Sequence, residues 1–220
     1  MTVSQPQGFL AVPTTGNGPG VLVLHAWWGL NDTIKMYCTQ LAGAGFVAFA
    51  PDLYHGKVTD NIAEAEALAQ ALDANHRQVR AEIVQATRFL SEHADKATRG
   101  LAVIGFSLGA YYALDLSATC PEYIRSVVLF YGTGLADFSN SKAAYLGHFA
   151  ANDPFEPQAN IYSLEDALKQ AGRPVTFYHY SGTGHWFCEP DRDQAYNPAA
   201  ARLAWERTLH FLERGTTDDS

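Results

Sequence analysis

The sequence contains little cysteine and carries no excess of positive charge. Its three cysteines, Cys38, Cys120 and Cys188, cannot all pair and lack the spacing of metal ligands, which favours a reducing compartment such as the cytoplasm. Fifteen Lys and Arg stand against 23 Asp and Glu, so the formal net charge is −8. Such a surface does not attract nucleic acid or anionic membranes, and we expect neither as a partner.

Long hydrophobic runs and a secretory signal are also missing. No apolar run approaches the roughly 20 residues that cross a bilayer, and residues 1–8 lack the basic start and apolar stretch of a signal peptide. What remains is an ordinary composition, with 47% hydrophobic and 17% charged residues in a chain of 220. Because no break in composition occurs, we expect one cytoplasmic domain spanning residues 1–220, as a monomer or small homo-oligomer.

Short apolar runs alternate with segments of helical periodicity along the chain. This alternation predicts an α/β fold with a doubly wound, mostly parallel sheet and helices on both faces. In such sheets the functional residues gather at the carboxyl ends of the strands. The predicted strands are 9–12, 21–25, 46–50, 101–104, 126–131, 145–150 and 175–180; the predicted helices are 32–44, one or two within 61–93 broken near 73–75, 108–118, 161–171 and 198–214.

The segment Gly105-Phe106-Ser107-Leu108-Gly109 lies where a predicted strand meets a predicted helix. At either glycine a side chain would collide with the tightly reversing backbone, and the serine hydroxyl is then raised at the end of the strand. The Leu108 N–H, in the first turn of the helix, would face developing negative charge. Because the pattern occurs by chance in roughly one chain in ten of this length, it indicates a nucleophile only together with an acid and a base.

A general base must reach the serine hydroxyl from a loop outside the sheet. Among eight histidines, only His185 lies on a glycine-flanked loop after a late strand, and we predict it as the base. His179 falls within a strand and His210 within the last helix, so we interpret both as structural. His25 and His148 lie at or near strand ends at the same edge, and we interpret each as a core histidine.

The acid that orients the imidazole should lie between the nucleophile helix and the histidine loop. Asp153, three residues past the strand 145–150, fits this place best, and Glu156 on the same loop is the rival. Alone, Asp153 before Pro154 would be an ordinary turn residue. The order Ser107, Asp153, His185 is the Ser, Asp, His order of α/β-hydrolases.

A second oxyanion donor should come from the loop after an early strand. The segment 25–29 occupies this loop, and we predict the backbone N–H of Trp27 as the donor beside that of Leu108. Two adjacent tryptophans there indicate a pocket wall. The predicted substrate pocket is lined by Trp27, Trp28, Phe106 and Trp186.

These residues together predict acyl transfer through an acyl-enzyme. His185 would take the proton of Ser107 as the hydroxyl attacks an ester carbonyl, and the backbone donors would hold the oxyanion. Water would then release the acyl group. This chemistry requires neither a metal nor an organic cofactor, and the expected partner is a small-molecule ester or lactone.

Several distinctive segments occur along nearly the whole chain: Trp-Trp-Gly-Leu-Asn at 27–31, Ala-Pro-Asp-Leu-Tyr at 50–54, Gly-Phe-Ser-Leu-Gly-Ala at 105–110, Asn-Asp-Pro-Phe at 152–155, Gly-His-Trp-Phe at 184–187, and the closing stretches 195–201 and 204–212. In these segments the chain resembles the dienelactone hydrolase family of the α/β-hydrolases. The resemblance implies a compact α/β-hydrolase fold without a large cap domain, the triad Ser107, Asp153 and His185, and Asp153 instead of Glu156 as the acid.

The sequence departs from this family at three positions that bear on the substrate. The resemblance implies a cysteine where Ser107 stands, a glutamate where Ala26 stands and a carboxylate-binding arginine where Glu189 stands. A serine is activated by its histidine alone, so Ser107 with Ala26 is self-consistent. Glu189 would repel a carboxylate, and we therefore expect a neutral ester or lactone with a small acyl group.

Two other functions use the same fold. A peptidase or acyl-peptide processing enzyme is one, although no extra domain that filters peptides is visible in 220 residues. A non-catalytic ligand-binding homologue is the other, and it would need a broken triad. Turnover of aminoacyl p-nitroanilides but not esters would favour the first; failure of Ser107 to react with a fluorophosphonate would favour the second.

Overall fold

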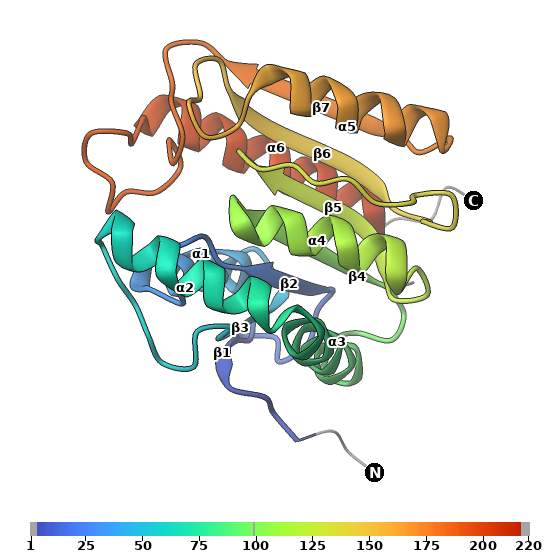
Figure 1. Ribbon diagram of the computed structural model, residues 1–220. Helices are drawn as coiled ribbons and strands as arrows, with labels where there is room; N and C mark the ends of the chain where they lie inside the picture. Colours follow the sequence, from blue (N-terminus) through green and yellow to red (C-terminus); the bar gives the residue numbers. More distant parts are fainter. Residues whose placement is uncertain (1–3, 99, 217–220) are drawn as a thin grey trace.

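Seven strands form one sheet in the order β1-β3-β2-β4-β5-β6-β7 (Figure 1). The computed structural model describes residues 4–98 and 100–216, so residues 1–3, 99 and 217–220 of the predicted domain 1–220 lie outside the described residues. The strands are β1 Gly8–Ala11, β2 Gly20–Leu24, β3 Val47–Pro51, β4 Leu101–Phe106, β5 Ile124–Phe130, β6 Ala144–Ala150 and β7 Val175–Tyr180.

The sheet is mostly parallel, as the sequence predicts. All neighbouring strands from β3 to β7 pair in parallel, and only β1 pairs antiparallel with β3. The central strands β2 and β4 are buried along their whole length. This burial on both faces is the reason why these strands are continuous apolar runs instead of alternating ones.

Helices cover both faces of the sheet. Along β2, Val21 and Val23 pack in one core with α1 and α6, whereas Leu22 and Leu24 pack in the other core with α3 and α4. Successive side chains point to opposite faces, so one strand supplies both cores. The helices are α1 Asp32–Gly43, α2 Ile62–Ala74, α3 His76–His93, α4 Leu108–Thr119, α5 Gln158–Gln170 and α6 Pro198–Thr216.

Two boundaries differ from the prediction in ways that affect the site. The helix predicted to begin at Ile161 begins three residues earlier, at Gln158, directly after Pro157. The hydrophobic periodicity did not reveal this first turn, because residues 158–160 contain no large apolar side chain. The strand predicted to end at Tyr131 ends at Phe130, and Tyr131 takes a positive φ of 39°. The direction of the Tyr131 side chain therefore does not follow the alternation of side chains between the two faces of β5.

The carboxyl ends of β4, β5, β6 and β7 lie along one edge of the sheet, because these neighbouring strands are parallel. The loops that follow them carry Ser107, Tyr131, Asp153 and His185. The topology therefore brings these four residues to one edge, although 78 positions separate Ser107 from His185. No helix among residues 4–98 and 100–216 is long and apolar enough to cross a membrane.

Candidate active site

Ser107 lies at a strained turn between β4 and α4. Its φ of 50° and ψ of −110° are unusual for a residue with a side chain. A Cβ at Gly105 would collide with the Gly109 backbone, and a Cβ at Gly109 would collide with the Leu24 carbonyl oxygen. Both glycines are therefore required for the close approach of backbone that raises the serine.

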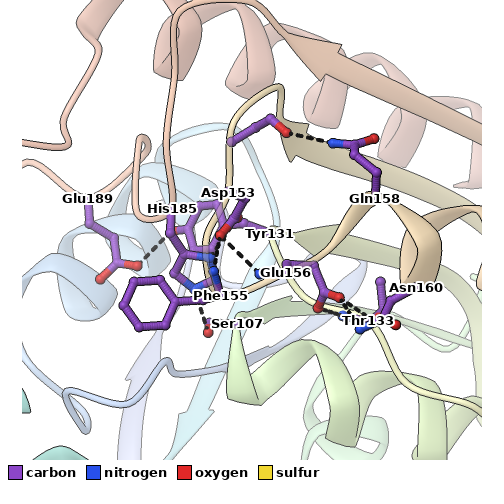
Figure 2. Close-up of polar contacts among 11 residues, drawn as sticks. Ser107, Tyr131, Thr133, Asp153, Phe155, Glu156, Gln158, Asn160, His185 and Glu189 are labelled. Carbon is purple, nitrogen blue, oxygen red and sulfur yellow. Dashed lines mark hydrogen bonds and ion pairs between the residues drawn. The ribbon is translucent and has the colours of Figure 1, made fainter.

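The structure brings Ser107, His185 and Asp153 into one chain of hydrogen bonds (Figure 2). The Ser107 Oγ lies 2.9 Å from His185 Nε2, and His185 Nδ1 lies 2.7 Å from Asp153 Oδ2. The side chains of His185 and Asp153 are 5% and 1% exposed. Exclusion of water strengthens these charge-assisted interactions, so the arrangement suits transfer of the serine proton to the imidazole.

The two acids of the 153–156 loop have different partners. Asp153 Oδ1 accepts the backbone N–H groups of Phe155 and Glu156, which leaves Oδ2 for His185. The Glu156 carboxylate instead accepts the backbone N–H and the hydroxyl of Thr133 and the amide of Asn160. Glu156 therefore fastens the loop after β5, and the geometry selects Asp153 as the acid facing the imidazole.

The predicted oxyanion donors lie beside the serine. Leu108 is the first residue of α4, so its N–H has no acceptor within the helix. Within the part of the chain that the structure describes, no backbone hydrogen bond uses the Trp27 N–H. Ser107, Leu108 and Trp27 line one cavity of about 270 Å³.

Only some of the residues predicted to line the substrate pocket line this cavity. Trp27 and Trp186 line it, whereas Trp28 lines a larger neighbouring cavity that also reaches His185. The prediction for Phe106 is wrong, because its buried side chain lines neither of these cavities and its ring stacks on that of Phe130, with 4.6 Å between the ring centroids. A residue next to the nucleophile need not face the substrate, since the sharp turn sends neighbouring side chains to different sides.

A family model described as the dienelactone hydrolase family matches residues 7–215. The chain belongs to the dienelactone hydrolase family. The match spans every strand and includes all three residues of the hydrogen-bonded chain at Ser107. As a member of this family, the protein is a hydrolase of esters or lactones.

Curated relatives and solved structures agree with this assignment. Protein usf of Aquifex pyrophilus is 33% identical over 218 residues, covering 96% of this chain and 94% of the relative. Carboxymethylenebutenolidase of Pseudomonas sp. (strain P51) is 29% identical over 216 residues, covering 93% and 88%. A dienelactone hydrolase-like promiscuous phosphotriesterase from metagenomic libraries shares the fold, with a TM-score of 0.82 at 22% identity and coverage of 92% and 88%.

Glu189 does not have the position that the sequence predicts in this dienelactone hydrolase-family protein. Its side chain is 1% exposed, does not line the cavity at Ser107 and accepts a hydrogen bond of 2.7 Å from the Tyr131 hydroxyl. Burial raises the pKa of the Glu189 carboxyl to about 8. Glu189 therefore cannot repel a substrate carboxylate by direct contact, which corrects the predicted reason for a neutral substrate.

The other buried histidines of the site edge are structural, as expected. His25 Nε2 accepts the Leu53 N–H, and its Nδ1 lies 2.7 Å from the Ala26 carbonyl oxygen. His148 bonds the hydroxyls of Tyr180 and Thr208. Burial lowers the pKa of His25 and lowers that of His148 to about 3. The His148 ring is therefore neutral in the core, and His25 Nε2 carries no proton where it accepts the Leu53 N–H.

Five residues that line the cavity at Ser107 in this dienelactone hydrolase-family protein were not predicted from the sequence: Tyr111, Tyr131, Gly132, Thr133 and Phe155. Tyr131 places its ring 4.9 Å from that of His185, and Phe155 places its ring at 5.2 Å. Tyr131 and Thr133 could have been predicted, because both follow β5 at the sheet edge where functional residues gather.

Among the described residues, no three His, Cys, Asp or Glu side chains form a group that could hold a metal ion.

Proposed function

We propose that this protein is a serine hydrolase that cleaves small carboxylic esters or lactones through an acyl-enzyme. The observation that carries the proposal is the 2.9 Å separation of Ser107 Oγ and His185 Nε2, with His185 Nδ1 bonded to Asp153. Nucleophile, base and orienting acid within hydrogen-bond reach are the geometric signature of this chemistry. The family and the carboxymethylenebutenolidase relative support lactones as well as open esters.

In the proposed first half-reaction, Ser107 Oγ forms a bond to the carbonyl carbon and its proton passes to His185 Nε2. Asp153 stabilises the imidazolium, and the N–H groups of Trp27 and Leu108 hold the oxyanion. The intermediate then breaks the bond to the alcohol oxygen, which takes the proton from His185. In the second half, water loses a proton to His185 as its oxygen bonds to the acyl carbon. The bond between this carbon and Ser107 Oγ then breaks, and Oγ takes the proton back from His185, which releases the acid and restores the serine.

Features of the chain support a small neutral substrate and a cytoplasmic location. The cavity at Ser107, of about 270 Å³, is bordered by the rings of Trp27, Tyr111 and Trp186 and offers no cationic side chain for a carboxylate. All three cysteines are free thiols, which suits a reducing compartment.

The test compares the wild type with Ser107→Ala on p-nitrophenyl acetate and butyrate. We expect hydrolysis to fall by at least about 10³-fold with an unchanged circular dichroism spectrum, and a fluorophosphonate to label only the wild type. Residual activity close to wild type would refute the mechanism. Turnover of aminoacyl p-nitroanilides without ester turnover would indicate the peptidase, and absence of labelling with no turnover at all would indicate a binding protein.

A further inference from the structure

Two cavities meet at the imidazole of His185. The inner cavity, of about 270 Å³, contains Ser107, and the outer cavity, of about 600 Å³, extends toward residues 191–197. They share His185, Trp186 and Phe155 as lining residues. The inner cavity falls just below the range of roughly 300–1,000 Å³ typical of ligand sites, and the outer one lies within it.

Phe155 lines both cavities and packs against aromatic rings of their linings. Its ring lies 6.0 Å from Trp27 on the inner side, 4.8 Å from Trp186 and 5.2 Å from His185. Figure 2 shows this ring beside the imidazole and close to Ser107. The side chain is nevertheless 46% exposed, which is unusual for a large apolar residue inside a site. Phe155 is therefore packed against neighbouring rings but still open enough to be contacted by a substrate.

The chemistry of ester cleavage decides which half of a substrate lies on which side. The leaving alcohol oxygen must come within hydrogen-bond reach of His185 Nε2, because it takes the proton that the imidazole received from Ser107. The carbonyl oxygen must lie at the backbone donors of Trp27 and Leu108, which line only the inner cavity. The alcohol part thus leaves toward His185 and the acyl part stays with the inner lining.

We propose that the outer cavity binds the alcohol part of the ester and that Phe155 determines specificity by separating it from the acyl part. This inference rests on the proposed function. It assigns a small acyl group to the inner cavity and a bulky alcohol to the outer one.

The lining of the outer cavity indicates the class of alcohol. Trp28 and Tyr196 add aromatic surface to that of Phe155 and Trp186. The single cation, Arg192, is already engaged, since its guanidinium lies 3.9 Å from the Trp28 ring and bonds Asp191 at 3.0 Å. Asp60 and Asp193 also line the cavity and leave it acidic. The favoured alcohols are therefore aromatic, and anionic alcohols are disfavoured.

A substrate series tests the assignment of the two cavities in the wild-type protein. We expect kcat/KM for 2-naphthyl acetate to exceed that for methyl 2-naphthoate by at least about a hundredfold, after correction for the intrinsic alkaline hydrolysis rates. The neutral ester should also exceed 6-carboxy-2-naphthyl acetate by at least about tenfold. Equal corrected rates for the first pair, or a preference for the naphthoate, would overturn the assignment, and faster turnover of the anionic ester would overturn the proposed alcohol class.

Variants of Phe155 test whether its ring separates the two parts of the ester. Phe155→Ala removes the ring between the cavities, so the corrected preference for 2-naphthyl acetate over methyl 2-naphthoate should fall at least about tenfold. Phe155→Trp places a larger ring there and should raise KM for 2-naphthyl acetate more than KM for methyl acetate. The matched control is Tyr162→Ala, which removes a 57% exposed ring on α5 that lines neither cavity and should change no ratio.

A merely structural role of Phe155 would lower the rates for all esters by one factor and leave the ratios within about threefold, which would overturn the proposal. Fluorophosphonate labelling of Ser107 in every variant separates the two proposals. Labelling with unchanged ratios refutes the role of Phe155 alone, whereas absence of labelling in the wild type refutes the hydrolase mechanism.

Discussion

The Tyr131 hydroxyl donates a 2.7 Å hydrogen bond to the Glu189 carboxyl, and this bond ties the end of β5 to the loop that carries His185. The Tyr131 ring lies against the imidazole at 4.9 Å, and Glu189 is buried behind it. The bond therefore holds the Tyr131 ring against the imidazole of the proposed base. A carboxyl with a raised pKa at this point makes this contact sensitive to pH.

The buried Glu189 carboxyl should make stability fall as the pH rises. Its pKa is raised from 4.5 to about 8, so between these values the native state keeps a proton that the unfolded state has lost. The contribution to the free energy of unfolding is complete below about pH 4.5 and is lost progressively up to about pH 8, by at most roughly 1.4 kcal/mol per pH unit. Glu189→Gln should lack this part of the pH dependence.

Urea unfolding of wild type and Glu189→Gln at pH 5.5 and 7.5 measures this difference. The variant should gain on the order of 2 kcal/mol relative to the wild type between the two pH values. Glu66→Gln on the exposed surface of α2 is the matched control and should follow the wild type. Parallel pH dependences for all three proteins would show that Glu189 does not stay protonated in the native state.

Asp153→Asn should lower kcat for p-nitrophenyl acetate by about 10³- to 10⁴-fold, because an amide at His185 Nδ1 favours the wrong tautomer and cannot stabilise the imidazolium. Glu156→Gln keeps an acceptor oxygen for Thr133 and should cost less than about tenfold. Steady-state kinetics on both variants decides between the two acids. A larger loss in the Glu156 variant would overturn the assignment of Asp153.

Gly109→Ala should destabilise the protein by about 1–3 kcal/mol or more, since its Cβ would collide with the carbonyl oxygens of Leu24 and His25. The shift would also move Ser107, so activity should fall with stability. Gly43→Ala, at the end of α1 where a Cβ meets open space, should instead be neutral or stabilise by up to about 1 kcal/mol. Thermal unfolding measures both, and equal melting temperatures for the two variants would contradict the steric argument.

Much of the fold could be predicted from the sequence because the determining signals are local. The break near 73–75 appears as the boundary between α2 and α3, and the strand 175–180 has the predicted bounds. The turn at Ser107 could be predicted because Gly105 and Gly109, two residues on either side of the serine, allow a close approach of backbone that a Cβ would block. The first turn of α5 could not, since its polar residues have no apolar period.

The sequence by itself determined the parallel sheet, the nucleophile turn and the order of Ser107, Asp153 and His185, because periodicity and glycine spacing act over a few residues. Only the tertiary structure decided where Phe106, Phe155 and Glu189 point. Their surroundings come from strands far apart in the chain, and a side chain's burial depends on those neighbours and not on its own sequence context. For this reason Glu189 supports Tyr131 in the core, and Phe155 stands between two cavities.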